Sequence, residues 1–199
     1  MLSVVIQAGG RSSRMGEDKG LVPLAGRSMI EHVLTRVAGL GDETLITTND
    51  PDAYEYLGLP MASDPEPGAG ALPGLRTALK AAQGDTVLVL ACDMPFVNRL
   101  LLEYMLEQSS NADVVVPRWN DNYQTLHAVY NRKRTLKAVE QALAEGERRM
   151  ISFYPQLRVH VVEPEQIRQY DPQGRSFFNV NTPEELQEAE RLLAELRGR

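Results

Sequence analysis

The alternation of short apolar runs with amphipathic helical segments constrains the fold of this chain more than any other feature of its sequence. Patterns typical of strands occupy residues 2–7, 43–49, 59–64, 85–93, 112–118, 124–130 and 157–163. Helical patterns occupy residues 27–40, 51–58, 75–82, 98–109, 134–146 and 182–196. Strands that alternate with helices pair in a mainly parallel sheet that is covered on both faces. The sequence therefore predicts an α/β fold, a three-layer αβα sandwich with right-handed crossovers, as a single domain over residues 1–199.

Composition narrows the classes of function. The chain has 199 residues and a net charge of -6, which argues against a broad nucleic-acid surface. No apolar run approaches the roughly 18 residues needed to cross a membrane, and the first residues lack the basic and apolar pattern of a signal peptide. The single cysteine, Cys92, excludes an internal disulfide. We expect a cytoplasmic protein with small-molecule ligands and neither a membrane nor a nucleic-acid partner.

The first apolar run leads into the segment QAGGRSSRMGEDKG, residues 7–20. It matches neither the dinucleotide-binding fingerprint, because Gly9 and Gly10 are adjacent, nor the common P-loop, because Lys19 is followed by glycine. Adjacent glycines allow close approach of the backbone to a ligand and direct successive N–H groups into one concavity, which attracts anions. Arg14 and Lys19 add two positive charges. The segment is either a glycine turn bordered by solvated charges or a phosphate-binding loop, and its several specified positions favour the second.

Two further segments follow strands, where a fold of this class binds ligands, and another precedes the last helix. Asp93 follows a strongly apolar run and either turns the chain, caps a helix or supplies a carboxylate ligand to Mg²⁺, which prefers oxygen donors. Residues 63–75 are rich in proline and glycine, as in a flexible surface loop or a functional one. Asn179 and Asn181 precede the last helix and either cap it or present two amides on one side of an extended segment.

The segment from Ala8 to Lys19 resembles the signature L-A-G-G-x-S-x-R-M-G-x-D-K of the molybdenum cofactor guanylyltransferases, the MobA-type enzymes among the Rossmann-like nucleotidyltransferases. Within that signature the chain departs at Gln7, where the family usually has leucine and contacts guanine partly through its backbone. The similarity runs from residue 4 to about residue 193. It includes a C-D-x-P motif at Asp93 and the motif N-x-N-T-P-E-E-L from Asn179.

The resemblance implies a role for each matching residue. Lys19, Arg14 and Asp93 would be catalytic, and Asp93 and Asn181 would hold Mg²⁺. Asp64 and the segment from Gly70 to Gly74 would shape the guanine pocket, where the family has G-P-L-A-G and this chain has GALPG. The implied nucleotide contacts are Ala8, Gly9, Gly10, Arg14, Lys19, Asp64, Gly70, Gly74 and Asp93.

The implied reaction is transfer of GMP from GTP to molybdopterin, with release of pyrophosphate and with Mg²⁺ as the cofactor. Other proteins of cofactor maturation are further implied partners. Two alternatives stay open at this point. One is a CTP-dependent enzyme acting on molybdopterin or on a sugar or alcohol phosphate, and the other is a non-catalytic GTP-binding adaptor in molybdoenzyme maturation. The presence of Lys19, Asp93 and Asn181 together favours an enzyme.

The remaining polar and reactive residues give weaker signals. Cys92 lies in an apolar run and is expected in the core, and three scattered histidines have no zinc-site spacing. Several residues form either a surface or part of a pocket for the second substrate, and the sequence assigns no firm role to them: Arg118, Trp119, Tyr123, Gln124, Arg148 and Arg149.

Overall fold

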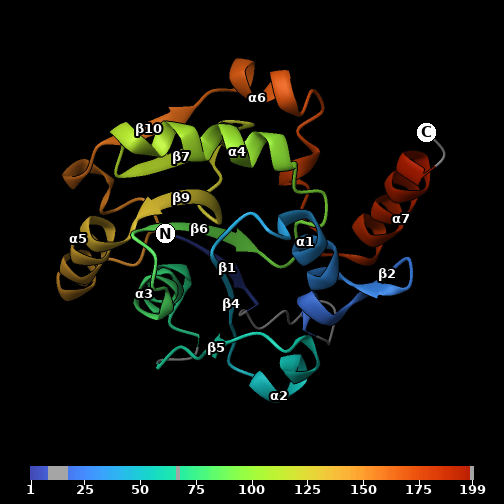
Figure 1. The fold of residues 1–199 in the computed structure, drawn as a ribbon, viewed down its shortest axis with the longest axis horizontal. Coiled ribbons are helices and arrows are strands. Elements are labelled where there is room, and N and C mark those ends of the chain that lie inside the picture. Colours follow the sequence, from blue (N-terminus) through green and yellow to red (C-terminus); the bar gives the residue numbers. More distant parts are fainter. Residues whose placement is uncertain (9–17, 66–67, 198–199) are drawn as a thin grey trace.

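The structure is a computed structural model that describes residues 1–8, 18–65 and 68–197, and its centre is an eight-stranded sheet (Figure 1). The strand order is β10-β7-β9-β6-β1-β4-β5, with β8 paired to β7. β9 is antiparallel to both of its neighbours, and the other strands of this path are parallel to one another. The strands are β1 (Leu2–Gln7), β4 (Glu43–Thr47), β5 (Met61–Ala62), β6 (Thr86–Ala91), β7 (Val114–Trp119), β8 (Asn122–Tyr123), β9 (His127–Asn131) and β10 (Val159–Val162).

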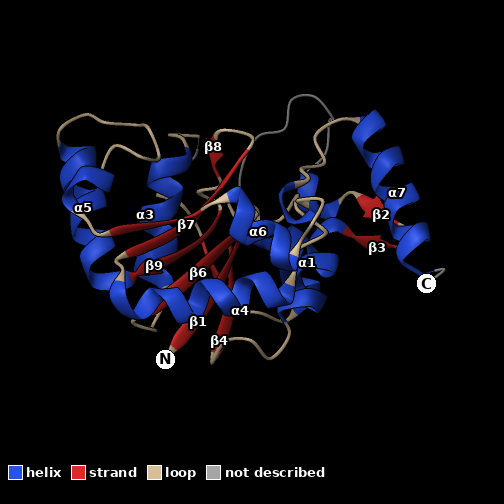
Figure 2. Ribbon diagram, turned by 90° about the horizontal axis from the view of Figure 1, so that it is seen from above, coloured by secondary structure: helices blue, strands red, loops and turns tan. Residues whose placement is uncertain are grey.

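Helices cover both faces of the sheet, as Figure 2 shows. On one face lie α3 (Ala71–Ala81) and α5 (Arg132–Ala144), and on the other lie α1 (Met29–Val37), α4 (Arg99–Gln108) and α6 (Pro164–Tyr170). The alternation of side chains along β1 divides the core, because Val4 and Ile6 pack with the second group of helices and Val5 with the first. The predicted αβα sandwich is therefore confirmed.

The last helix, α7 (Pro183–Arg197), lies beside the sheet rather than over it (Figure 1). It packs near a short hairpin of β2 (Pro23–Leu24) and β3 (Arg27–Ser28), which the sequence did not predict. A third apolar cluster joins the two, formed by Leu24, Met29, Phe96, Val180, Ala189 and Leu193. Within the described residues, no helix combines the length and apolar character needed to cross a bilayer.

One predicted boundary is wrong in a way that matters for the site. The helix expected from Leu75 starts at Ala71, so the segment GALPG forms its first turn instead of a loop. Pro73 is tolerated there, because the first turn of a helix lacks internal partners for its N–H groups. Gly70 immediately precedes the helix with a φ of 110°, which favours glycine.

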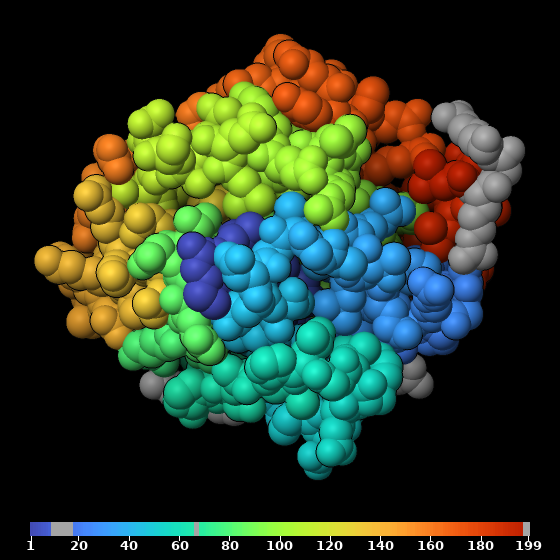
Figure 3. All heavy atoms as spheres, in the orientation of Figure 1, coloured from blue at the N-terminus to red at the C-terminus, as the bar shows by residue number. Residues whose placement is uncertain are grey.

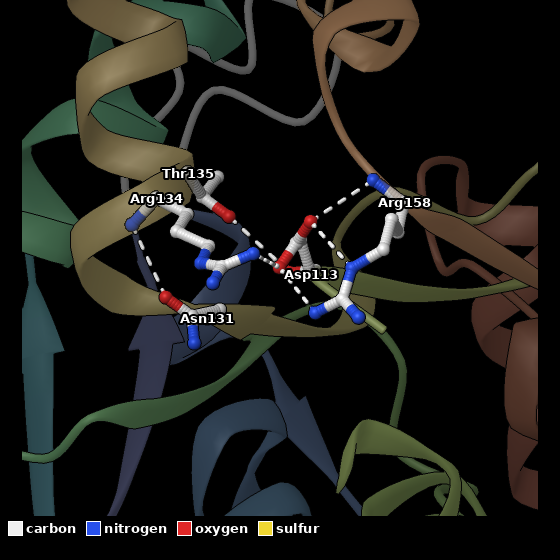
Figure 4. Close-up of polar contacts among 5 residues, drawn as sticks. All are labelled: Asp113, Asn131, Arg134, Thr135 and Arg158. Carbon is white, nitrogen blue, oxygen red and sulfur yellow. Dashed lines mark hydrogen bonds and ion pairs between the residues drawn. The ribbon is translucent and has the colours of Figure 1, made fainter. Parts of the chain in front are cut away.

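An ion cluster at the N-terminal edge of the sheet ties β7, β10 and α5 together (Figure 4). The Asp113 carboxylate, only 4% exposed, accepts hydrogen bonds from the backbone N–H and guanidinium of Arg158 and from the guanidinium of Arg134. Thr135 Oγ donates to the backbone carbonyl of Asp113 at 3.3 Å. Figure 3 shows the molecule from the side of this edge, where the first residues of the chain reach the surface.

Candidate active site

Three strands end in register at the edge of the sheet opposite the ion cluster. Gln7 at the end of β1 is level with Thr47 of β4 and with Ala91 of β6. Hydrogen bonds continue past these ends, from Ala8 N to Thr47 O at 2.8 Å and from Cys92 N to Gln7 O at 3.1 Å. The segments that follow the three strands therefore leave the sheet side by side, as expected for a ligand site in a parallel sheet.

Lys19, Asp93 and Asn181 meet at this edge, although they lie far apart in the sequence. The Lys19 ammonium is 3.5 Å from Asp93 Oδ2 and donates a hydrogen bond to Asn181 Oδ1. Both charged side chains are largely buried, with exposures of 26% for Lys19 and 14% for Asp93. The structure thus brings together the cation and the two predicted metal ligands.

Local structure explains how Asn181 reaches this cluster. The backbone N–H of Val180 donates to the carbonyl of Asp93 at 3.0 Å, which holds the segment before α7 against the end of β6. Thr182 and Glu185 cap α7. The Thr182 hydroxyl accepts from the backbone N–H of Glu185 at 3.2 Å, and the Glu185 carboxylate accepts from the backbone N–H of Thr182 at 3.0 Å. The amide of Asn181 does not cap the helix and turns to Lys19, whereas Asn179 donates to the carbonyl of Phe177 at 3.4 Å.

The electrostatics of the cluster favour a bound cation. Burial raises the pKa of the Asp93 carboxyl above its ordinary value, and the neighbouring Lys19 ammonium opposes that rise. A divalent cation would stabilise the carboxylate in the same sense as the ammonium. Among the described residues no three His, Cys, Asp or Glu side chains gather as a metal cage. Asp93 and Asn181 fit instead the kind of Mg²⁺ site that has few protein ligands and is completed by substrate phosphates.

The predicted phosphate loop is described only at its two ends. Ala8 is buried directly after β1, and Lys19 begins the 3-10 turn η1 (Lys19–Leu21). Gly9, Gly10 and Arg14 lie outside the described residues, so their roles stay predictions.

The residues predicted for the base pocket gather around the start of α3. Gly74 lies against the side chain of Gln7, and a Cβ at this glycine would be 3.1 Å from Gln7 Nε2. Asp64 accepts a hydrogen bond from Thr77 Oγ, one turn after Gly74, at 3.4 Å. Gln7 also borders the Lys19 cluster through its bond to Cys92, so the two groups of residues flank the end of β1.

An open cavity of about 360 Å³ adjoins the segment that carries Asn181, and polar side chains that include Gln173, Arg175 and Glu188 line part of it. Trp119, Phe177 and Phe178 line it, and the Trp119 and Phe177 rings lie 5.9 Å apart. The guanidinium of Arg168 lies 5.3 Å from the Trp119 ring. Trp119 is one of the residues left without a role by the sequence, whereas Arg118 pairs with Glu163 at the surface.

Sequence patterns did not indicate a contact between Tyr54 and Asp18, the residue before Lys19. Asp18 accepts hydrogen bonds from the backbone N–H of Gly20 at 3.0 Å and from the hydroxyl of Tyr54 at 2.6 Å. Tyr54 ends the short helix α2 (Pro51–Tyr54) and is fully buried. Asp18 belongs to the signature segment, but nothing in the sequence identifies its tyrosine partner. Cys92 is buried nearby, and burial raises the pKa of its thiol, in keeping with the predicted core position.

Known proteins resemble this chain over nearly all of its length. Residues 4–161 match the family described as the MobA-like NTP transferase domain. A "Probable molybdenum cofactor guanylyltransferase" of Pelotomaculum thermopropionicum is 40% identical over 191 residues, which cover 96% of this chain and 92% of that protein. The molybdenum cofactor guanylyltransferase of Syntrophotalea carbinolica is 34% identical over 187 residues, with coverages of 93% and 89%. The crystal structure of molybdopterin-guanine dinucleotide biosynthesis protein A from Archaeoglobus fulgidus superposes with a TM-score of 0.81 at 29% identity, covering 97% of this chain and 99% of that one.

Proposed function

Because this chain belongs to the MobA-like NTP transferase family, we propose that it transfers GMP from GTP to molybdopterin and releases pyrophosphate. The chain is a nucleotidyltransferase with a place in molybdenum cofactor biosynthesis. The choice of guanine and of the acceptor follows the names of the relatives. The observation that carries the proposal is the convergence of Lys19 on Asp93 and Asn181 at the strand ends.

Neutralisation of charge is the main task of a site for this reaction. The terminal phosphate of molybdopterin must approach the triphosphate of GTP, and two unit charges about 4 Å apart repel by about 4 kcal/mol at an effective dielectric of 20. Lys19 supplies a positive charge in a largely buried position, where such charges act most strongly. Arg14 and the backbone at Gly9 and Gly10 would add to it.

The chemical step needs no protein nucleophile. An oxygen of the acceptor phosphate forms a bond to the α-phosphorus of GTP, and the bond from that phosphorus to the bridging oxygen breaks, so pyrophosphate leaves with the electron pair. The attacking oxygen is already deprotonated near neutral pH, so no general base is needed. What the chain must supply is in-line positioning of the two phosphates and stabilisation of the charge on pyrophosphate.

Asp93 and Asn181 would hold Mg²⁺ through one carboxylate and one amide oxygen. Bound there, the ion would neutralise charge on the triphosphate. The Lys19 ammonium now contacts both oxygens, so in the nucleotide complex it would move to the phosphates.

The two remaining parts of the substrates have places beside this cluster. We assign the guanine to the group of Gln7, Gly74 and Asp64, where the absence of a side chain at Gly74 lets the Gln7 amide lie against the start of α3. We assign the ring system of the acceptor to the cavity lined by Trp119, Phe177 and Phe178, because aromatic walls suit a planar heterocycle.

Pyrophosphate release with each nucleoside triphosphate, with and without molybdopterin, tests the proposal. GTP together with molybdopterin is expected to give the fastest release, and Lys19→Ala to lower that turnover by about 100-fold. Lys133→Ala is the matched control, because Lys133 is 77% exposed and its ion pair, with Asp85, lies at the surface. A preference for CTP, or tight GTP binding without turnover, would establish one of the two alternatives instead.

A further inference from the structure

Lys19 is held from two directions, at its ammonium and at its backbone. At its ammonium end it contacts Asp93 and Asn181. At its backbone end it is bracketed by Asp18, whose carboxylate caps the turn η1 by accepting from Gly20 N at 3.0 Å. The same carboxylate oxygen accepts the Tyr54 hydroxyl at 2.6 Å.

Packing in the core fixes the position of the Tyr54 hydroxyl. Its ring is fully buried among residues from the sheet face that α1 and α4 cover. The backbone of Gly20 lies directly on the phenol, since a Cβ at that position would be 2.4 Å from the Tyr54 hydroxyl oxygen and 3.2 Å from Cys92 Sγ. No larger residue fits at position 20 without displacing the tyrosine. Close packing and the hydrogen bond therefore both hold the Tyr54 hydroxyl in place against the turn η1.

The donor in the hydrogen bond between Tyr54 and Asp18 is also fixed. Burial raises the pKa of the Tyr54 hydroxyl far above its ordinary value, which keeps the phenol protonated as the donor of this bond. The Asp18 oxygen is the acceptor of this hydrogen bond. A charge-assisted O–H···O bond of this length is among the stronger neutral-donor contacts in proteins.

We propose that Tyr54 is a positioning residue, which sets the reach of Lys19 by anchoring Asp18 through its hydroxyl. Lys19 immediately follows Asp18, and a shift of the turn would move the lysine Cα relative to Asp93, which lies in the turn after β6. A flexible lysine side chain is otherwise free to adopt many rotamers, so fixing its backbone narrows the positions that its ammonium can take. The inference rests on the role proposed above for Lys19 in neutralising phosphate charge.

A purely structural role for Tyr54 makes a different prediction, and a double-mutant cycle separates the two. Tyr54→Phe keeps the ring and removes the anchor, and it is expected to lower kcat for pyrophosphate release about 10-fold, because small misplacements of catalytic groups cost that much or more. In a Lys19→Ala background the same change is expected to lower kcat less than about twofold, because no ammonium is left to position. A structural role would give the same loss in both backgrounds.

The control is a second buried tyrosine. Tyr130 is fully buried in the other core cluster, and its hydroxyl donates to the carbonyl of Thr125 at 2.6 Å. Tyr130→Phe removes a bond of the same length that involves neither Asp18 nor Lys19 and is expected to leave kcat unchanged. If Tyr54→Phe does not fold, Asp18→Ala takes its place in the cycle, and Asp18→Asn, which keeps an acceptor oxygen, is expected to recover most of the loss.

The outcomes distinguish this inference from the proposal on which it rests. Equal losses from Tyr54→Phe in the two backgrounds, or no loss in the wild-type background, would overturn the positioning role while leaving the role of Lys19 intact. Near-normal turnover of Lys19→Ala would overturn both. A loss that vanishes without Lys19, together with an active Tyr130→Phe variant, would establish Tyr54 as the anchor.

Discussion

Replacing Lys19 by methionine is expected to tighten the binding of a divalent cation in the absence of nucleotide. The ammonium now contacts the two oxygens, on Asp93 and Asn181, that we assign to the metal, so a cation must first displace it. Methionine keeps much of the length and apolar stem of lysine and removes the charge. In this variant the affinity for the metal should therefore rise while the turnover falls.

The magnitude follows from the geometry of the pair. At 3.5 Å and an effective dielectric of 20, the attraction between Lys19 and Asp93 is about 5 kcal/mol before any desolvation or entropy is counted. Partly exposed pairs retain only a fraction of that as a net contribution, here about 1 to 2 kcal/mol. Because 1.4 kcal/mol corresponds to a factor of ten, Lys19→Met should bind the cation about tenfold more tightly.

Titration with Mn²⁺, followed by the electron paramagnetic resonance signal of the free ion, measures this directly. Asp93→Asn is expected to weaken binding strongly, and Lys133→Met, which removes a lysine from an exposed ion pair, to leave it unchanged. Unchanged or weaker Mn²⁺ binding by Lys19→Met would refute the reasoning that the lysine and the metal share the same oxygens.

The remaining predictions concern stability. Asp93→Asn should raise the melting temperature at neutral pH while it abolishes turnover. The rise should be about 2–4 °C for each 1 kcal/mol gained in the free energy of unfolding. The sign follows because burial raises the pKa of Asp93, so that its ionised form destabilises the folded state above that pKa. Asp113→Asn should lower the free energy of unfolding by about 1 to 3 kcal/mol, because it weakens several bonds to a buried carboxylate. Hydrogen bonds from Arg158 lower the pKa of Asp113, so the stabilisation is present above the ordinary carboxyl pKa and is lost as the pH falls through the lowered one. Chemical denaturation from pH 7 to pH 3 should therefore show a shallower acid-side loss of stability in the Asp113→Asn variant, and an unchanged slope would contradict the assignment.

The sequence predicts the sheet and its helices well, because buried parallel strands are read as continuous apolar runs. β1 and β6 lie within the ranges expected for them, and α1, α4 and α5 lie close to theirs. The hairpin of β2 and β3 was missed because two-residue strands leave no periodic pattern. The first turn of α3 was mistaken for a loop because its glycines and proline suggest one, although a proline at that place is compatible with a helix.

The candidate site is partly predictable for a topological reason. Lys19, Asp93 and Asn181 all follow a strand or precede a helix, and ligands bind at the strand ends of such sheets. Their convergence over long sequence separations is found only in the structure. Tyr54 could not be foreseen, because a tyrosine in a short amphipathic segment has the same pattern whether its hydroxyl is exposed or donates to an aspartate.

The most direct test of the central claim is a crystal structure of the protein with Mg²⁺ and GTP. The account predicts the triphosphate at the ends of β1 and β6, with Lys19 on its oxygens, the metal between them and Asp93, and the base beside Gln7 and Gly74. A nucleotide bound elsewhere, with the Lys19 ammonium still on Asp93 and Asn181, would contradict it.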